Sequence, residues 1–184
     1  CFLRPHLHIC LLRVIIAHLF YLCKVTWYTS FTMSIDELLL LVRRDFPNYT
    51  ITTGDDFSWA PAAKTITVDT KHNSPAQLLH EVAHAELGHQ TFSRDIQLIE
   101  MEREAWEYCT KVLAPRYDVS LAMDDDVVQE SLDSYRLWLT SRSSCPHCGA
   151  IGLQKAKDTY SCMHCHVQWQ VNEARTCRLI RTIK

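Results

Sequence analysis

The sequence predicts an α+β fold: a small, mainly helical domain with a short β-sheet, followed by a small cysteine-rich module. Three observations lead to this prediction. Several segments combine helix-start residues with apolar side chains at helical spacing, two short runs alternate apolar and polar residues, and four cysteines form two close pairs near the C-terminus. The length of 184 residues suits one modest domain with an appendage. We expect divisions at residues 1–32, 33–140 and 145–184.

Charge is distributed unevenly along the chain. The overall formal charge of −2 divides into +3 for residues 1–32, −9 for residues 33–144 and +4 for residues 145–184. An acidic body with a basic tail indicates that the tail binds nucleic acid or an acidic partner, or that it is simply a solvated end.

Residues 1–32 form an apolar N-terminal extension. The run from Cys10 to Cys23 is strongly apolar but covers only about 14 residues and includes Arg13, short of the roughly 20 apolar residues that span a bilayer. No small-residue cleavage site of a signal peptide follows it. We therefore favour an upstream extension of a chain that starts at Met33 over a leader or a membrane anchor.

The next segment predicts one helix and two short strands. Ser34 and Glu37 occupy capping-box positions of a helix over 35–46, which stops before Pro47. Strands are expected over 49–53 and 64–69, with turn-forming glycine, aspartate and proline between them.

Three longer helices follow. Ser74 caps the first, which runs to about Leu87 with Gly88 as its stop. The second covers 94–113 and ends at Pro115. The third covers 125–140, and residues 140–144 read as a linker. Its predicted apolar stripe consists of Val128, Leu132, Tyr135 and Leu139.

The first of these helices carries the sequence His80-Glu81-Val82-Ala83-His84. Histidines four residues apart lie on one face of a helix, one turn apart, so both can bind a single zinc ion. Glu81 is rotated away from that face and is expected to act as a general base toward water at the metal. The sequence therefore predicts a catalytic zinc site in which His80 and His84 are ligands.

A third ligand is needed, and a carboxylate must supply it. No histidine occurs between His89, which follows the helix stop, and His147. On the second helix Glu102 falls within the apolar stripe, whereas Glu104 shares the solvated face. A carboxylate on a buried stripe is costly unless it pairs or binds metal. We predict Glu102 as the third ligand, with Glu104 as the alternative and a buried salt bridge as the non-metal explanation.

The sequence HEVAH, followed by an acidic helix reading ExxAW from Glu102 to Trp106, resembles the ImmA/IrrE-type zinc metallopeptidases over roughly residues 34–115. The resemblance implies a zincin-like fold, zinc binding by His80, His84 and Glu102, and a general base at Glu81. Asn or Asp is common in the family where Trp106 stands, and Phe-Ala follows where this chain has Tyr108 and Cys109. The family's substrates are often transcriptional regulators, so the resemblance implies a regulatory protein as substrate.

Two further assignments stay open. The donor that stabilises the transition state is His89, Tyr108 or Tyr135. The strand at 64–69 either pairs with an extended substrate or is an ordinary internal strand.

The cysteine-rich module predicts a second zinc site. Two CxxC pairs separated by thirteen residues are typical of a zinc ribbon. Four thiolates close the coordination shell, so this zinc is structural and helps to fold a segment too small to fold alone. Aromatic and arginine side chains beside it offer a surface for DNA or a protein, or pack on the catalytic body. The expected ligands are Cys145, Cys148, Cys162 and Cys165.

The leading prediction is a cytoplasmic zinc-dependent metalloendopeptidase that acts on a protein or peptide, with one catalytic and one structural zinc. The alternatives are a non-catalytic adaptor that binds DNA or protein, and a DNA-associated protease of the SprT type. The absence of any histidine between His89 and His147 weighs against the SprT type, and membrane association is not expected.

Overall fold

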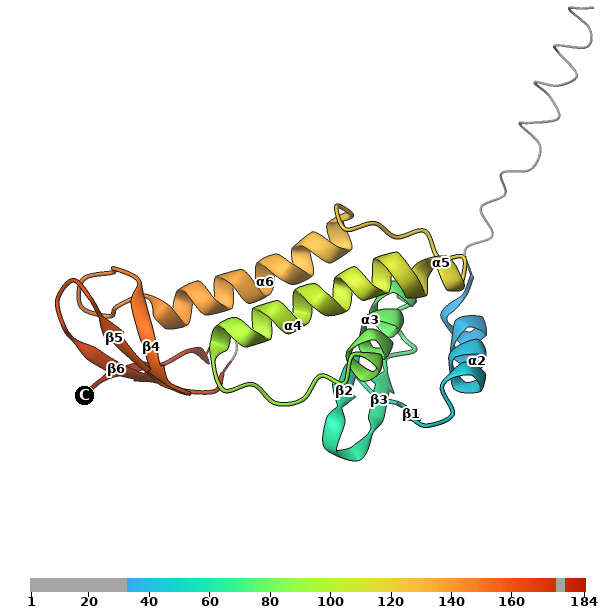
Figure 1. Cartoon of the computed structure of the whole chain (residues 1–184), viewed down its shortest axis with the longest axis horizontal. Coiled ribbons are helices and arrows are strands. Elements are labelled where there is room, and N and C mark those ends of the chain that lie inside the picture. Colours follow the sequence, from blue (N-terminus) through green and yellow to red (C-terminus); the bar gives the residue numbers. More distant parts are fainter. Residues whose placement is uncertain (1–32, 175–177) are drawn as a thin grey trace, which may run out of the picture. The chain divides into compact units, whose positions relative to one another are not determined.

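The computed structural model describes residues 33–174 and 178–184, and it confirms the α+β class (Figure 1). Residues Met33–Lys184 form one compact unit. The expected apolar extension at residues 1–32 lies outside the described residues. In the part of the chain that is described, no helix is both long and apolar enough to cross a bilayer.

The first described element is helix α2 (Ile35–Asp45), and its start is as predicted. Ser34 and Glu37 form the complete capping box, which satisfies backbone N–H groups that the first helical turn leaves free. Its buried face consists of Ile35, Leu38, Leu39 and Val42.

A three-stranded sheet follows, with the strand order β1-β3-β2. Strands β1 (Thr50–Thr53) and β3 (Thr65–Val68) pair in parallel, and β2 (Ser58–Ala60) pairs antiparallel to β3. The segment that forms β2 was expected to be a turn only. Because β3 is central and both of its edges are paired, it is an internal strand and cannot add a substrate strand.

Helix α3 (Pro75–Glu86) contacts α2, α4, β2 and β3, so it lies at the centre of the main core. The Ser74 hydroxyl accepts the Gln77 N–H at its start, and Gly88 adopts a left-handed φ of 67° just past its end. Four apolar side chains of α3 are fully buried: Leu78, Leu79, Val82 and Ala83. Burial of each of the larger ones stabilises the fold by about 1.5–3 kcal/mol.

Helix α4 (Asp95–Tyr108) continues into a π-helical segment (Cys109–Leu113) and a short helix α5 (Ala114–Arg116). The sequence predicted one regular helix that stops at Pro115. Instead the helical backbone continues through Pro115, which lies inside α5, and ends at Arg116. Within the π segment the Thr110 hydroxyl donates to the Trp106 carbonyl at 2.9 Å.

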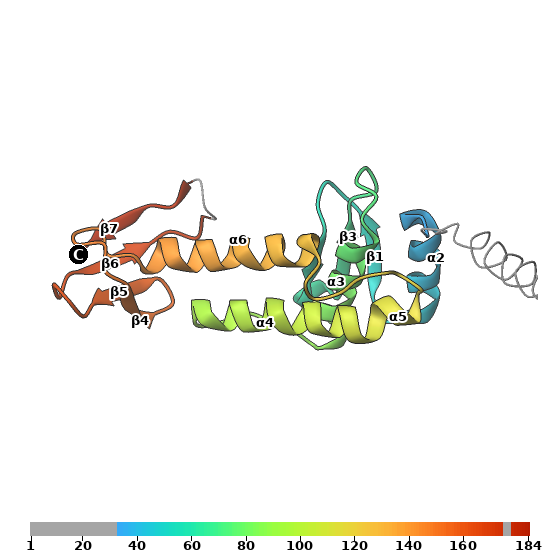
Figure 2. The same cartoon turned by 90° about the horizontal axis from the view of Figure 1, so that it is seen from above.

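Helix α6 (Asp126–Ser143) lies beside α4 in both views (Figures 1 and 2). It extends through most of the expected linker at 140–144, so the linker prediction was wrong. Arg142 and Ser143 are buried at its C-terminal end, and the helix leads directly into the cysteine-rich module.

That module contains an antiparallel sheet with the order β4-β5-β6-β7. Its strands are β4 (Gly152–Ala156), β5 (Thr159–Cys162), β6 (Gln168–Val171) and β7 (Arg181–Ile183). Trp169 and Val171 face a small separate core that also holds Tyr160.

Candidate metal sites and the adjoining pocket

Helix α3 places His80 and His84 one turn apart, and both side chains are buried. Their Nε2 atoms lie 3.1 Å from each other. The His80 ring also stacks on Trp106 of α4, with ring centroids 4.1 Å apart. The two imidazoles therefore present nitrogen atoms to one point.

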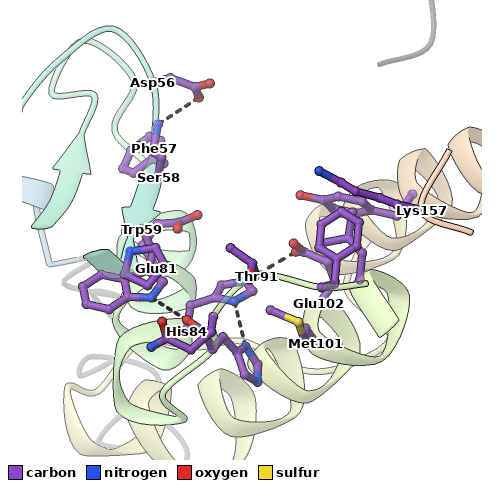
Figure 3. Close-up of a pocket in the computed structure, with 16 residues that line it drawn as sticks. Asp56, Phe57, Ser58, Trp59, Glu81, His84, Thr91, Met101, Glu102 and Lys157 are labelled. Carbon is purple, nitrogen blue, oxygen red and sulfur yellow. Dashed lines mark hydrogen bonds and ion pairs between the residues drawn. The ribbon is translucent and has the colours of Figure 1, made fainter. Parts of the chain in front are cut away.

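Glu102 reaches that point from α4, and its side chain is also buried (Figure 3). Its Oε2 atom lies 3.1 Å from His80 Nε2 and 3.5 Å from His84 Nε2. Glu104, the alternative third ligand, is 54% exposed and faces His89. The structure thus brings Glu102, and not Glu104, to the two histidines.

The spacing of these donor atoms fits a tetrahedral zinc site. Atoms about 2.0–2.1 Å from one zinc ion at tetrahedral angles lie roughly 3.3–3.4 Å from one another. The three observed separations of 3.1, 3.1 and 3.5 Å bracket that value. Two nitrogens and one oxygen at this spacing leave one corner of the tetrahedron for a water molecule or a substrate atom.

The protonation states at this cluster also suit a metal. Burial alone would raise the pKa of Glu102, but hydrogen bonds with His80 and His84 outweigh it and bring the pKa to about 2. Burial lowers the pKa of His80, which favours its neutral form. An ionised carboxylate and a neutral imidazole are the forms that bind zinc.

Glu81 lies beside the cluster without joining it. Its side chain is 9% exposed and lines the same pocket as His84 and Glu102. Burial raises its pKa to about 7, and a hydrogen bond from the Trp59 backbone opposes this effect. A carboxyl group that titrates near neutral pH can both accept a proton and return it.

The pocket has a volume of about 560 Å³, and α4, α6 and β2 contribute to its walls. Figure 3 shows Phe57, Ser58 and Trp59 of the β2 region on one side and Lys157 of the β4–β5 turn on the other. Tyr135 also lines this pocket, whereas Tyr108 packs against the main core. The apolar part of the lining includes Phe92, Leu98 and Met101.

The four cysteines of the module form the second cluster that could hold a metal. Four thiolates about 2.3 Å from one zinc ion lie roughly 3.8 Å apart. The Sγ atoms of Cys145 and Cys165 are 3.6 Å apart, and those of Cys148 and Cys162 are 3.5 Å apart. Backbone N–H groups in the second knuckle lower the pKa of Cys162 to about 6, which favours the metal-binding thiolate.

A buried polar network joins the cysteine-rich module to α4 and α6. Asp95, at the first position of α4, accepts from Arg142 Nε of α6 and from the Tyr160 hydroxyl of β5, each at 2.5 Å. Gln154 of β4 donates to the same carboxylate at 3.2 Å. These contacts fix the position of the N-terminal end of α4, the helix that carries Glu102.

Sequence reasoning missed three parts of this region: strand β2, the placement of His89 and the role of Asp95. Strand β2 has only three residues, and the signal for His89 was set aside because Gly88 ends α3. An aspartate at the start of a helix is ordinarily read as a capping or dipole residue, so its burial was not foreseen.

No known protein family, curated protein or solved structure matches this chain. The resemblance to ImmA/IrrE-type peptidases therefore rests on the residues named above alone.

Proposed function

We propose that the protein is a zinc-dependent metalloendopeptidase whose C-terminal module is a structural zinc ribbon. The main observation that supports this proposal is the buried cluster of His80, His84 and Glu102, whose donor atoms have tetrahedral spacing. Glu81 lies beside this cluster in an open pocket. A zinc ion held there supplies a Lewis acid that polarises a peptide carbonyl and makes water more acidic.

Two side chains of the pocket have separate catalytic roles in this proposal. Glu81 accepts the proton of the attacking water and passes it to the leaving amine, for which a pKa of about 7 is suitable. Tyr135 lies in the pocket and is the better placed of the two tyrosines to stabilise the developing oxyanion.

The pocket supports an extended peptide with an apolar side chain near the scissile bond. Within the described residues β2 pairs only with β3, so the outer edge of β2 can accept a substrate strand beside Trp59. Phe92, Leu98 and Met101 provide apolar surface that is only partly buried. This arrangement suits a protein segment better than a nucleotide.

The two alternatives are less well supported. A SprT-type site takes a third histidine where this chain has Glu102. Nucleic-acid binding by the module remains a prediction. Two of its basic side chains make contacts within the module region: Arg181 donates to the Ser144 carbonyl at 2.9 Å, and Lys157 forms a largely exposed pair with Glu173 at 3.3 Å. We further propose a reducing, cytoplasmic setting, in which the clustered thiols stay available to metal.

Metal analysis tests the proposed sites directly. We expect the intact chain to hold about two zinc ions, and His80→Ala or Glu102→Gln to hold about one, because each removes a ligand of the same site. Plasma emission spectroscopy of the dialysed protein gives the ratio.

Two exposed residues provide matched controls. Glu100→Gln on α4 and His164→Ala in the second knuckle should both retain two zinc ions, since neither side chain faces a cluster. A single zinc ion in the intact chain that survives His80→Ala would overturn the catalytic assignment.

A further inference from the structure

His84 has a hydrogen-bond partner on the side of its ring that faces away from the metal cluster. Its Nε2 atom belongs to the cluster, while its Nδ1 atom lies 2.8 Å from Nδ1 of His89. His80 differs, because its Nδ1 atom is buried without a hydrogen-bond partner in the described part of the chain. Of the two histidines, only His84 therefore has a hydrogen bond at Nδ1 that can fix the orientation of its ring.

His89 is held firmly at this position. After Gly88 turns the chain through its left-handed conformation, the His89 N–H donates to the His84 carbonyl at 3.0 Å. The Trp59 indole N–H donates to the His89 carbonyl, also at 3.0 Å. With 9% of its surface exposed and both backbone groups bonded, His89 has little freedom to move its ring.

The tautomers follow from this geometry. A neutral histidine that binds metal through Nε2 carries its proton on Nδ1. His84 must then donate to His89 Nδ1, which leaves the proton of His89 on Nε2. That nitrogen lies 3.6 Å from Glu104 Oε2, so a carboxylate faces it.

We propose that His89 is a positioning residue for the metal site: it accepts the Nδ1 proton of His84 and thereby fixes the tautomer and ring orientation that aim His84 Nε2 at zinc. This inference rests on the metal site of the proposed function. It also gives His89 a role other than third ligand, because its Nδ1 atom is engaged by His84 and its Nε2 atom faces Glu104.

The test is the zinc affinity of this site in the full chain, measured by competition with a chromophoric chelator, with the four-cysteine zinc as internal reference. Loss of an outer partner of a ligating histidine typically weakens metal binding about 10–100-fold. We expect that loss for His89→Ala and for His89→Gln, and a change of less than about threefold for Glu100→Gln, whose exposed side chain belongs to neither metal cluster.

His89→Asn distinguishes positioning from simple packing. The Oδ1 atom of asparagine occupies about the place of histidine Nδ1 and can accept from His84, whereas the glutamine amide extends toward the place of Nε2. Affinity within about fivefold of the original for His89→Asn, together with the loss in His89→Gln, is the expected pattern.

Three outcomes separate the hypotheses. If all His89 variants lose zinc affinity equally, and the loss parallels the fall in their melting temperatures, His89 has only a packing role and the inference is overturned. Unchanged affinity in His89→Ala would overturn it while leaving the proposed function intact. An original chain that binds zinc only at its cysteines would overturn the proposed function and this inference together.

Discussion

Glu81→Gln is expected to lower peptide hydrolysis by about 10²–10⁴-fold, the usual contribution of a general base. Glutamine has nearly the same shape as glutamate but cannot accept the proton of the attacking water. The zinc content should remain at about two per chain, because Glu81 is not part of the cluster formed by His80, His84 and Glu102.

The assay is cleavage of a quenched fluorescent peptide library, compared at equal zinc content. Glu86→Gln is the matched control: Glu86 lies on the same helix, is exposed, and accepts a hydrogen bond from Tyr49 that glutamine can keep. Cleavage by Glu81→Gln at the original rate would exclude Glu81 as the base. A chain with two zinc ions that cleaves no peptide of the library would favour the adaptor.

Arg142→Ala should destabilise the fold by about 3–5 kcal/mol, the typical cost of breaking a buried ion pair. The guanidinium is almost fully buried: it donates to Asp95 at 2.5 Å and to the Asn172 carbonyl at 2.6 Å, and lies over the Trp138 ring. Its loss leaves the Asp95 carboxylate buried without its main cationic partner.

Urea denaturation at saturating zinc measures this effect. Arg136→Ala on the same helix is the control, because its pair with Asp133 is half-exposed and worth at most about 1 kcal/mol. The double variant Asp95→Asn/Arg142→Met should be destabilised by less than the sum of the losses measured for Asp95→Asn alone and for Arg142→Met alone. Strict additivity, or a loss no larger than that of Arg136→Ala, would show that the network contributes little.

Local sequence signals predicted much of the fold. The capping box of Ser34 and Glu37 and the cap at Ser74 act within one helical turn, so they could be read directly and were confirmed. The apolar periodicity of α4 also placed Glu102 on the buried face and Glu104 on the exposed one.

The errors share one physical cause: they concern residues whose environment is set by distant parts of the chain. Arg142 looked like part of a polar linker, yet Asp95, forty-seven positions away, makes its burial favourable. Strand β2 forms because β3 offers an edge to pair with, and His89 acquires its partner only when the chain turns back at Gly88. Sequence patterning detects faces of helices and strands but not such pairings.

The continuation of α6 through Ser143 bears on how separable the two halves of the protein are. A zinc ribbon is commonly regarded as an independently folding module that can occur in different proteins. Here an excised fragment ending at residue 140 would carry Asp95 without Arg142 or Tyr160, both of which bond to its carboxylate in the intact chain. Removal of residues 141–184 would therefore take away the side chains that bond to Asp95, so the two parts of the chain depend on each other for their structure.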